Sequence, residues 1–188
     1  MRKTRKRPAG TNGADRRRLG RIPAALAAAL LALPAAASAQ APDPQPEAFG
    51  DWVLVRAAGV CQLRQTRLSA QSGAVLLEML LLPPGNGDDG ALAGLRVPLG
   101  VSLPDGIAWR HPARPGEAIA LAWQHCDPAL CLAAGAISGA ELDRLKRGER
   151  IEVGFRPLPS ANPVRLPVSL RGVTAGWRAL EACVSSGD

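Results

Sequence analysis

Residues 75–82 read Val-Leu-Leu-Glu-Met-Leu-Leu-Leu, an apolar stretch in which Glu78 is the one charged residue. The residues that follow, Pro-Pro-Gly-Asn-Gly-Asp-Asp-Gly at positions 83–90, are strong turn formers that stop a regular element. The length of the stretch is typical of a strand and short for a buried helix, and its apolar residues do not alternate with polar ones. It therefore predicts a strand buried on both faces, at the centre of a sheet.

The segments around this stretch are also typical of strands. Residues 61–68 alternate, so that Cys61, Leu63 and Gln65 lie on one face of a half-buried strand. Residues 92–109 are broken into short extended pieces by turn residues at 98–100 and 104–106. Further strands are expected at residues 49–56, 118–126, 131–137, 151–156 and 164–170. Short strands between frequent turns predict an all-β, mostly antiparallel fold, a single-domain β-sandwich or barrel-like fold with one or two short helices.

One helix has signals at both of its ends. Ser138 is a favourable N-cap, Glu141 stands at the capping-box position, and Gly148 fits the residue after the helix. Leu142 and Leu145 share a face, and the charged residues are expected in solvent: Glu141, Asp143, Arg144, Lys146, Arg147 and Glu149. The run 144–147 could bind an anion, but an exposed helix end that favours cations is the simpler interpretation. A second short helix is expected at residues 172–180, which include Trp177.

The first 39 residues have the pattern of an export signal. A basic segment, 1–21, precedes an apolar run, 22–37, that is too short for a typical membrane span, and residues 37–39 read Ala-Ser-Ala. We expect cleavage of a signal peptide after Ala39, a periplasmic or envelope-associated protein, and no stable membrane span afterwards. An uncleaved anchor is the alternative. The arginines at 16–18 leave twin-arginine export open beside the general secretory route, which we favour.

Removal of the leader changes both the domain layout and the charge. What remains is a Pro-rich tether at residues 40–48, a β domain at 49–184 and a tail at 185–188. Nine of the 23 basic residues and one of the 16 acidic residues precede Gln40, so 14 basic residues face 15 acidic ones in the remainder. Because no net positive field is left to attract phosphates, a nucleic-acid partner is excluded.

The four cysteines all lie after the leader. In an oxidising compartment an even number predicts disulfides, here two, and four cysteines allow three pairings. Cys126 and Cys131 flank the turn-like tetrapeptide Asp-Pro-Ala-Leu, so a strand–turn–strand would bring them within bonding range. That leaves Cys61 for Cys183, near the two ends of the domain. Both pairings are hypotheses at this stage.

Other sites for chemistry are weaker. A metal could be held by Cys126, Cys131, His125 and His111, but exported thiols tend to oxidise, and we expect neither a metal nor a cofactor. His125 is expected half-exposed on a strand and His111 in solvent. Asn86, Asp88 and Asp89 lack a downstream acidic ligand at the spacing of a calcium loop. No catalytic motif is present, and the four tryptophans are interpreted as core residues rather than as a ligand pocket: Trp52, Trp109, Trp123 and Trp177.

The order of these features resembles the invasion-associated locus B family of exported bacterial proteins. The resemblance runs from about residue 48 to residue 181 and rests on these pieces: Phe49-Gly50-Asp51-Trp52, Cys61-Gln62-Leu63-Arg64-Gln65, 98–101, 103–106, Cys126 with Cys131, 142–148 and 167–172. It implies a β-rich protein of the periplasm or envelope, in some pathogens linked to invasion of host cells, and it carries over no catalytic residues. Members commonly have a further cysteine where this chain has about Arg56, so Cys183 stands as its replacement and as the partner of Cys61.

These observations predict an exported, non-enzymatic binding or interaction module of the cell envelope. Its partner is expected to be a protein or another envelope component. The alternative is a periplasmic hydrolase or other envelope enzyme. An enzyme should have a concave pocket with convergent ionisable groups, whereas a binding module should have an exposed apolar surface or an open sheet edge.

Overall fold

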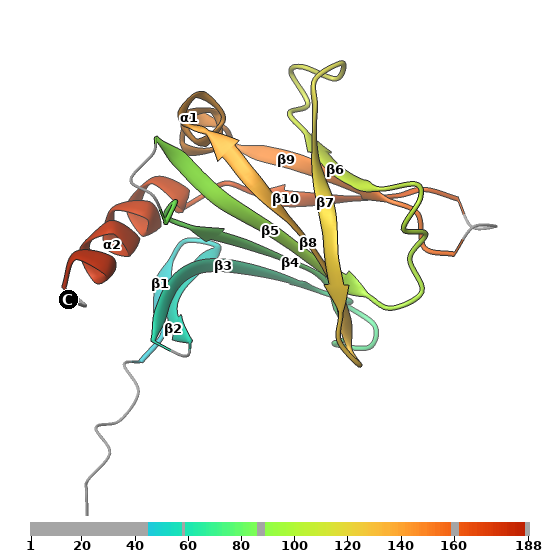
Figure 1. Ribbon diagram of the computed structural model, residues 1–188, viewed down its shortest axis with the longest axis horizontal. Helices are drawn as coiled ribbons and strands as arrows, with labels where there is room; N and C mark the ends of the chain where they lie inside the picture. The colour runs from blue at the N-terminus through green and yellow to red at the C-terminus, as the bar shows by residue number, and fades with distance from the viewer. Residues whose placement is uncertain (1–44, 58, 86–88, 159–161, 187–188) are drawn as a thin grey trace, which may run out of the picture. The chain divides into compact units, whose positions relative to one another are not determined.

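The computed structural model describes residues 45–57, 59–85, 89–158 and 162–186 (Figure 1), all of which belong to one compact unit, residues 41–188. Within these ranges the chain forms ten strands and two helices. The strands are β1 (Glu47–Phe49), β2 (Trp52–Ala57), β3 (Val60–Leu68), β4 (Val75–Leu82), β5 (Gly90–Pro98), β6 (Ile107–Arg110), β7 (Ala118–Cys126), β8 (Leu130–Ser138), β9 (Arg150–Phe155) and β10 (Val164–Ser169). The helices are α1 (Gly139–Arg147) and α2 (Val173–Ser185).

The strands form one antiparallel sheet in the order β1-β2-β3-β4-β5-β8-β7-β6-β9-β10. The all-β fold predicted from the sequence is therefore confirmed. β4 lies well inside the sheet, and Leu77, Met79 and Leu81 are completely buried on its core face. On its other face Leu80 and Leu82 are half-buried, which shows that this face is only partly covered.

Both helices pack on the core face of the sheet. α1 contacts β5 and β8, α2 contacts β1, β2 and β3, and the two helices touch each other (Figure 1). Leu142 and Leu145 of α1 and Trp177 and Leu180 of α2 are buried in the same hydrophobic core. Neither helix of the described ranges has the length and apolar character needed to cross a membrane.

The first hairpin closes against the end of the last strand. The Trp52 indole donates to the carbonyl of Ser169 at 2.9 Å, and the backbone N–H of Asp51 donates to the carbonyl of Arg171 at 3.0 Å. Gly50 and Gly172 both have positive φ, and their backbones approach so closely that a Cβ on either would collide with the other segment. We call this contact the closure, formed by residues 50–52 and 169–172.

The boundaries differ from the predicted ones at three places. β1 begins at Glu47, so the last residues of the expected tether belong to the sheet. α2 extends to Ser185 instead of ending at Leu180, because no helix breaker intervenes and Cys183 ties its last turns to β3. The single strand expected at residues 49–56 is interrupted by a turn at Gly50 and Asp51, which separates β1 from β2, whereas β5 ends at Pro98, where the sequence predicts the first break within residues 92–109. The proposed signal peptide, residues 40–44, Asn86 and Asp88 lie outside the described residues, and cleavage after Ala39 stays a prediction.

Candidate functional site

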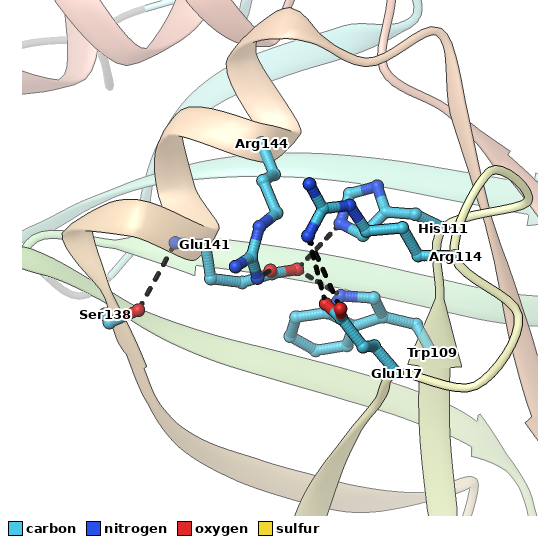
Figure 2. A network of polar contacts seen from close by, with 7 residues as sticks. All are labelled: Trp109, His111, Arg114, Glu117, Ser138, Glu141 and Arg144. Carbon is cyan, nitrogen blue, oxygen red and sulfur yellow. Dashed lines mark hydrogen bonds and ion pairs between the residues drawn. The ribbon is translucent and has the colours of Figure 1, made fainter.

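A buried carboxylate joins α1 to the end of β6. Glu141 is 2 % exposed, and its Oε1 accepts from the Trp109 indole Nε1 at 2.9 Å and lies 2.8 Å from His111 Nε2 (Figure 2). Its other oxygen accepts from Arg144 at 2.8 Å. The backbone N–H of Glu141 donates to Ser138 Oγ, which confirms Ser138 as the N-cap. Glu141 is the third residue of α1, and at this position its carboxylate lies over β6.

The charge of Glu141 is stabilised where it stands. Burial by itself raises the pKa of this carboxyl, but the hydrogen bonds from Trp109, His111 and Arg144 outweigh burial and hold the pKa below its ordinary value. A carboxylate that is ionised and surrounded by donors is a poor proton acceptor. It acts here as an anchor for β6 and for the loop that follows it.

This network corrects two expectations. Glu141 and Arg144 were expected in solvent with the other charged residues of α1, yet the carboxylate is buried and the guanidinium is bound to it. His111 was also expected in solvent, yet its side chain is 13 % exposed because it bonds to Glu141. The overlooked signal is the spacing of Trp109, on β6, and His111, just after it, because residues two apart in an extended segment have their side chains on the same side.

The remaining charges of α1 have separate partners. The Lys146 ammonium lies 5.2 Å from the centre of the Trp177 ring, and Arg147 pairs with Asp143 at 3.5 Å. The run 144–147 is therefore divided between a buried carboxylate, an aromatic ring and a surface ion pair. Gly148 ends the helix. Its φ is −79°, which any residue can adopt, so glycine is not needed there for a left-handed backbone. A Cβ would lie 2.7 Å from Leu170 Cδ1 instead.

The structure joins Cys61 to Cys183 and Cys126 to Cys131. His125 is exposed on β7, and His111 belongs to the Glu141 network rather than to the Cys126 turn. The described residues contain no group of three or more histidine, cysteine, aspartate or glutamate side chains able to hold a metal ion. The four cysteines thus serve the covalent framework.

The tryptophans are packed as core residues. Trp52, Trp109 and Trp177 are almost completely buried, and Trp123 is half-buried against the same core. The indole nitrogens of Trp52, Trp109 and Trp177 each donate to an oxygen: Ser169 O, Glu141 Oε1 and Glu181 Oε1. These three rings are therefore held in the core by both packing and a hydrogen bond.

A groove lies on the opposite face of the sheet from the core, over β6, β7, β9 and β10. Ala108 lies opposite both Ala120 and Gly154 in the strand register, so the floor has very little side-chain bulk. Two adjoining hollows of about 310 and 140 Å3 share Ala108, Gly154 and Arg165. We call them together the outer groove. Its floor is Ala108, Ala120 and Gly154, and its rim is Asp105, Arg110, Glu152, Arg156, Pro163 and Arg165.

The small residues of this floor are unusual for a solvent-facing strand surface. Strands favour β-branched and aromatic residues, whereas alanine and glycine are depleted in them. Here Ala118, Ala120 and Ala122 of β7 are all exposed, and Gly154 presents bare backbone. The sequence contains this signal as Ala-Ile-Ala-Leu-Ala at residues 118–122, but alternation alone did not show which face was open.

Charged side chains border the outer groove. Arg110 pairs with Glu152 at 3.3 Å and Arg156 with Asp105 at 3.1 Å. Arg165 is exposed opposite Gly154 and has no ion pair within the described part of the chain. The described residues that line the groove include no hydroxyl, thiol or imidazole. Such an arrangement is suited to docking a partner that brings negative charge.

The chain is similar to one protein family along most of its length. A family model described as invasion associated locus B protein matches residues 53–181. Two invasion protein B homologues of Brucella abortus, from strain 2308 and from biovar 1 strain 9-941, are each 29% identical over 141 residues, covering 72% of this chain and 79% of each relative. The crystal structure of invasion associated protein B from Bartonella henselae has a TM-score of 0.66 at 19% identity, covering 76% of this chain and 99% of that one.

Proposed function

The chain belongs to the invasion associated locus B family, and from this premise we propose that it is an exported, non-enzymatic binding module of the bacterial cell envelope. The observation that carries the proposal is the outer groove, where a floor of alanine and glycine is left uncovered while both helices pack on the other face. Exposed apolar surface bordered by polar residues is typical of protein interaction sites. We assign the partner to the protein class, as an extended segment with acidic side chains.

The chemistry of the rim supports an acidic segment. Three arginines face two carboxylates around the floor, and Arg165 is the one without an ion pair among the described residues. A guanidinium at the rim binds a carboxylate through two parallel hydrogen bonds, which adds orientation to attraction. The bare backbone at Gly154 allows the main chain of a partner to approach closely. The relatives carry the word invasion in their names, and we propose host-cell invasion as one setting in which such a partner would be met.

Site-specific crosslinking tests the proposal. The chain carries a photo-crosslinking amino acid at Ala120 on the groove floor, or at Gln71 in the β3–β4 turn as a control, and is irradiated in a bacterial envelope fraction. We expect a discrete crosslinked protein from position 120 and none from position 71. The adduct should disappear in Gly154→Arg, where a Cβ lies 3.9 Å from the nearest atom and the new side chain fills the floor.

A matched substitution separates docking from general damage. Gly116→Arg adds the same charge and bulk in the loop before β7, where no atom lies within 4 Å of the new Cβ. It should leave the crosslink intact. Absence of a crosslink at position 120, together with hydrolysis of generic ester or peptide substrates by the purified chain, would favour an envelope enzyme instead.

A further inference from the structure

The two cysteines of the Cys61–Cys183 disulfide differ in exposure. Cys61 on β3 is 4 % exposed and belongs to the hydrophobic core. Cys183 on α2 is half-buried and lines a hollow of about 480 Å3 between α2 and the β1–β2 hairpin, together with Leu54, Ala179 and Ala182. A small thiol that enters this hollow therefore meets Cys183, whereas Cys61 is covered by the core.

A cation lies against the sulfur of Cys183. The Arg56 guanidinium donates from Nη2 to Cys183 Sγ at 3.2 Å and to the Cys183 carbonyl at 3.3 Å. Arg56 lies opposite Cys61 in the β2–β3 register, so it adjoins both ends of the disulfide. An adjacent arginine stabilises a thiolate relative to a thiol. Negative charge that develops on sulfur during thiol–disulfide exchange is stabilised in the same way.

The second disulfide lacks this arrangement. Cys126 and Cys131 close the short β7–β8 turn. Arg96, which bonds to Asp127 in this turn, makes its other hydrogen bond to Glu78 rather than to a sulfur. A cation bound to sulfur is thus a property of the disulfide that ties α2 to the sheet. That disulfide holds the C-terminal turns of α2 on β3.

We propose that Cys183 is a site of thiol–disulfide exchange with a thiol of the cell envelope. The external thiolate attacks Cys183 Sγ, a new sulfur–sulfur bond forms there, and the Cys61–Cys183 bond breaks. The electron pair of the broken bond leaves on Cys61, which takes a proton from water. A second external thiolate then attacks the mixed disulfide at the external sulfur, releasing Cys183 as a thiolate beside Arg56. Two external thiols are oxidised to one disulfide as the protein disulfide is reduced to two thiols.

The test uses the folded, full-length chain and glutathione as the external thiol. Samples are quenched with acid at intervals, free thiols are alkylated, and mass spectrometry locates glutathione on individual cysteines. We expect the mixed disulfide on Cys183 and not on Cys61. Arg56→Leu should slow its formation about tenfold at neutral pH, because the cation beside the attacked sulfur is lost.

Two further variants keep the result interpretable. Arg56→Lys retains a cation and should exchange at close to the original rate even where the leucine variant folds poorly. Arg178→Leu removes an exposed arginine elsewhere on α2 and should change nothing. The proposal fails if glutathione appears on Cys61, or if opening of this disulfide proceeds at the rate of global unfolding and is the same in every variant. The first result would place the exchange at the wrong sulfur, the second would make the bond purely structural, and neither would affect the docking proposal.

Discussion

The buried carboxylate of Glu141 is bound by three hydrogen-bonding side chains. Its three donors come from three separate places, namely Trp109 on β6, His111 just after it and Arg144 one helical turn away. Hydrogen bonds to a buried charged group contribute more to stability than neutral ones. The residue thus fixes α1 against β6 and, through β6, the floor of the outer groove on the opposite face.

Glu141→Gln should lower the free energy of unfolding by about 2 kcal/mol, the typical contribution of hydrogen bonds to a charged group. The glutamine amide keeps one acceptor oxygen, but its NH2 group replaces the second one. A donor that bonded to that oxygen then faces another donor and loses its hydrogen bond. Denaturant unfolding followed by tryptophan fluorescence measures the effect. Asp143→Asn on the exposed side of α1 is the control and should change stability by less than about 0.5 kcal/mol. Equal effects of the two substitutions would contradict the anchoring role.

The same carboxylate predicts how stability depends on pH. Its pKa in the folded protein is lower than the ordinary value of 4.5, so the ionised form stabilises the fold. This contribution is complete above the unfolded pKa and is lost as the pH falls through the folded pKa. The wild-type chain should therefore lose stability more steeply than Glu141→Gln below about pH 4.5. Unfolding curves of both proteins between pH 7 and pH 3 should converge, and parallel curves would refute this prediction.

At the scale of elements, the closure explains several sequence pieces that are otherwise unrelated. Asp51 Oδ1 bonds to Arg171 at 2.8 Å, and this bond from Arg171 holds the pKa of Asp51 below its usual value. The Gln65 side chain donates to the carbonyl of Asp51, and the Trp52 indole reaches Ser169. The Phe-Gly-Asp-Trp segment, the Cys-Gln-Leu-Arg-Gln segment and the Ser-Leu-Arg-Gly segment thus meet at one place. These pieces hold the first hairpin to the last strand.

Gly172→Ala should test how tight the closure is. Gly172 has a φ of +101°, and a Cβ there would collide with the carbonyl of Phe49. We expect a loss of about 3 kcal/mol, from backbone strain together with displacement of the hairpin. Gly106→Ala is the matched control, since its φ is +70° but no atom lies within 4 Å of the new Cβ, and it should cost about 1 kcal/mol. Chemical denaturation of both variants gives the comparison, and similar losses would show that the closure can yield.

The elements could be predicted from the sequence where a local rule decides them. Residues 75–82 form β4 as expected, and the Ser138 cap starts α1 because both signals act within a few residues. The burial of Glu141 could not be predicted in this way, because it depends on Trp109 and His111 being brought over α1 by the sheet. The outer groove was missed for the same reason. Its floor combines Ala108, Ala120 and Gly154 from three strands, and only their register makes them neighbours.

At the scale of the whole described unit, one face of the sheet holds the structure together and the other is left open. Both helices, the Glu141 network and the Cys61–Cys183 disulfide are on the core side. The two edge strands are poor templates for pairing, because β1 has three residues and β10 contains Pro167. The proposed partner would therefore be more easily accommodated on the open face of small residues than at a sheet edge.

The two disulfides should contribute unequally to the stability of this unit. In the loop-entropy treatment, a disulfide removes more freedom from the unfolded chain as the loop that it closes grows longer. The Cys61–Cys183 bond spans 122 residues and the Cys126–Cys131 bond spans 5. The expected losses are about 5 kcal/mol for Cys61→Ala with Cys183→Ala and about 2 kcal/mol for Cys126→Ala with Cys131→Ala. Alanine avoids placing a hydroxyl at the buried Cys61 position.

Thermal and denaturant unfolding of the two double variants measures the difference in stability. Loss of the Cys61–Cys183 bond should also free the end of α2, which would be detected as faster amide hydrogen exchange after Leu180. A larger loss from the short loop would mean that native contacts around the β7–β8 turn, and not chain entropy, determine what these bonds contribute.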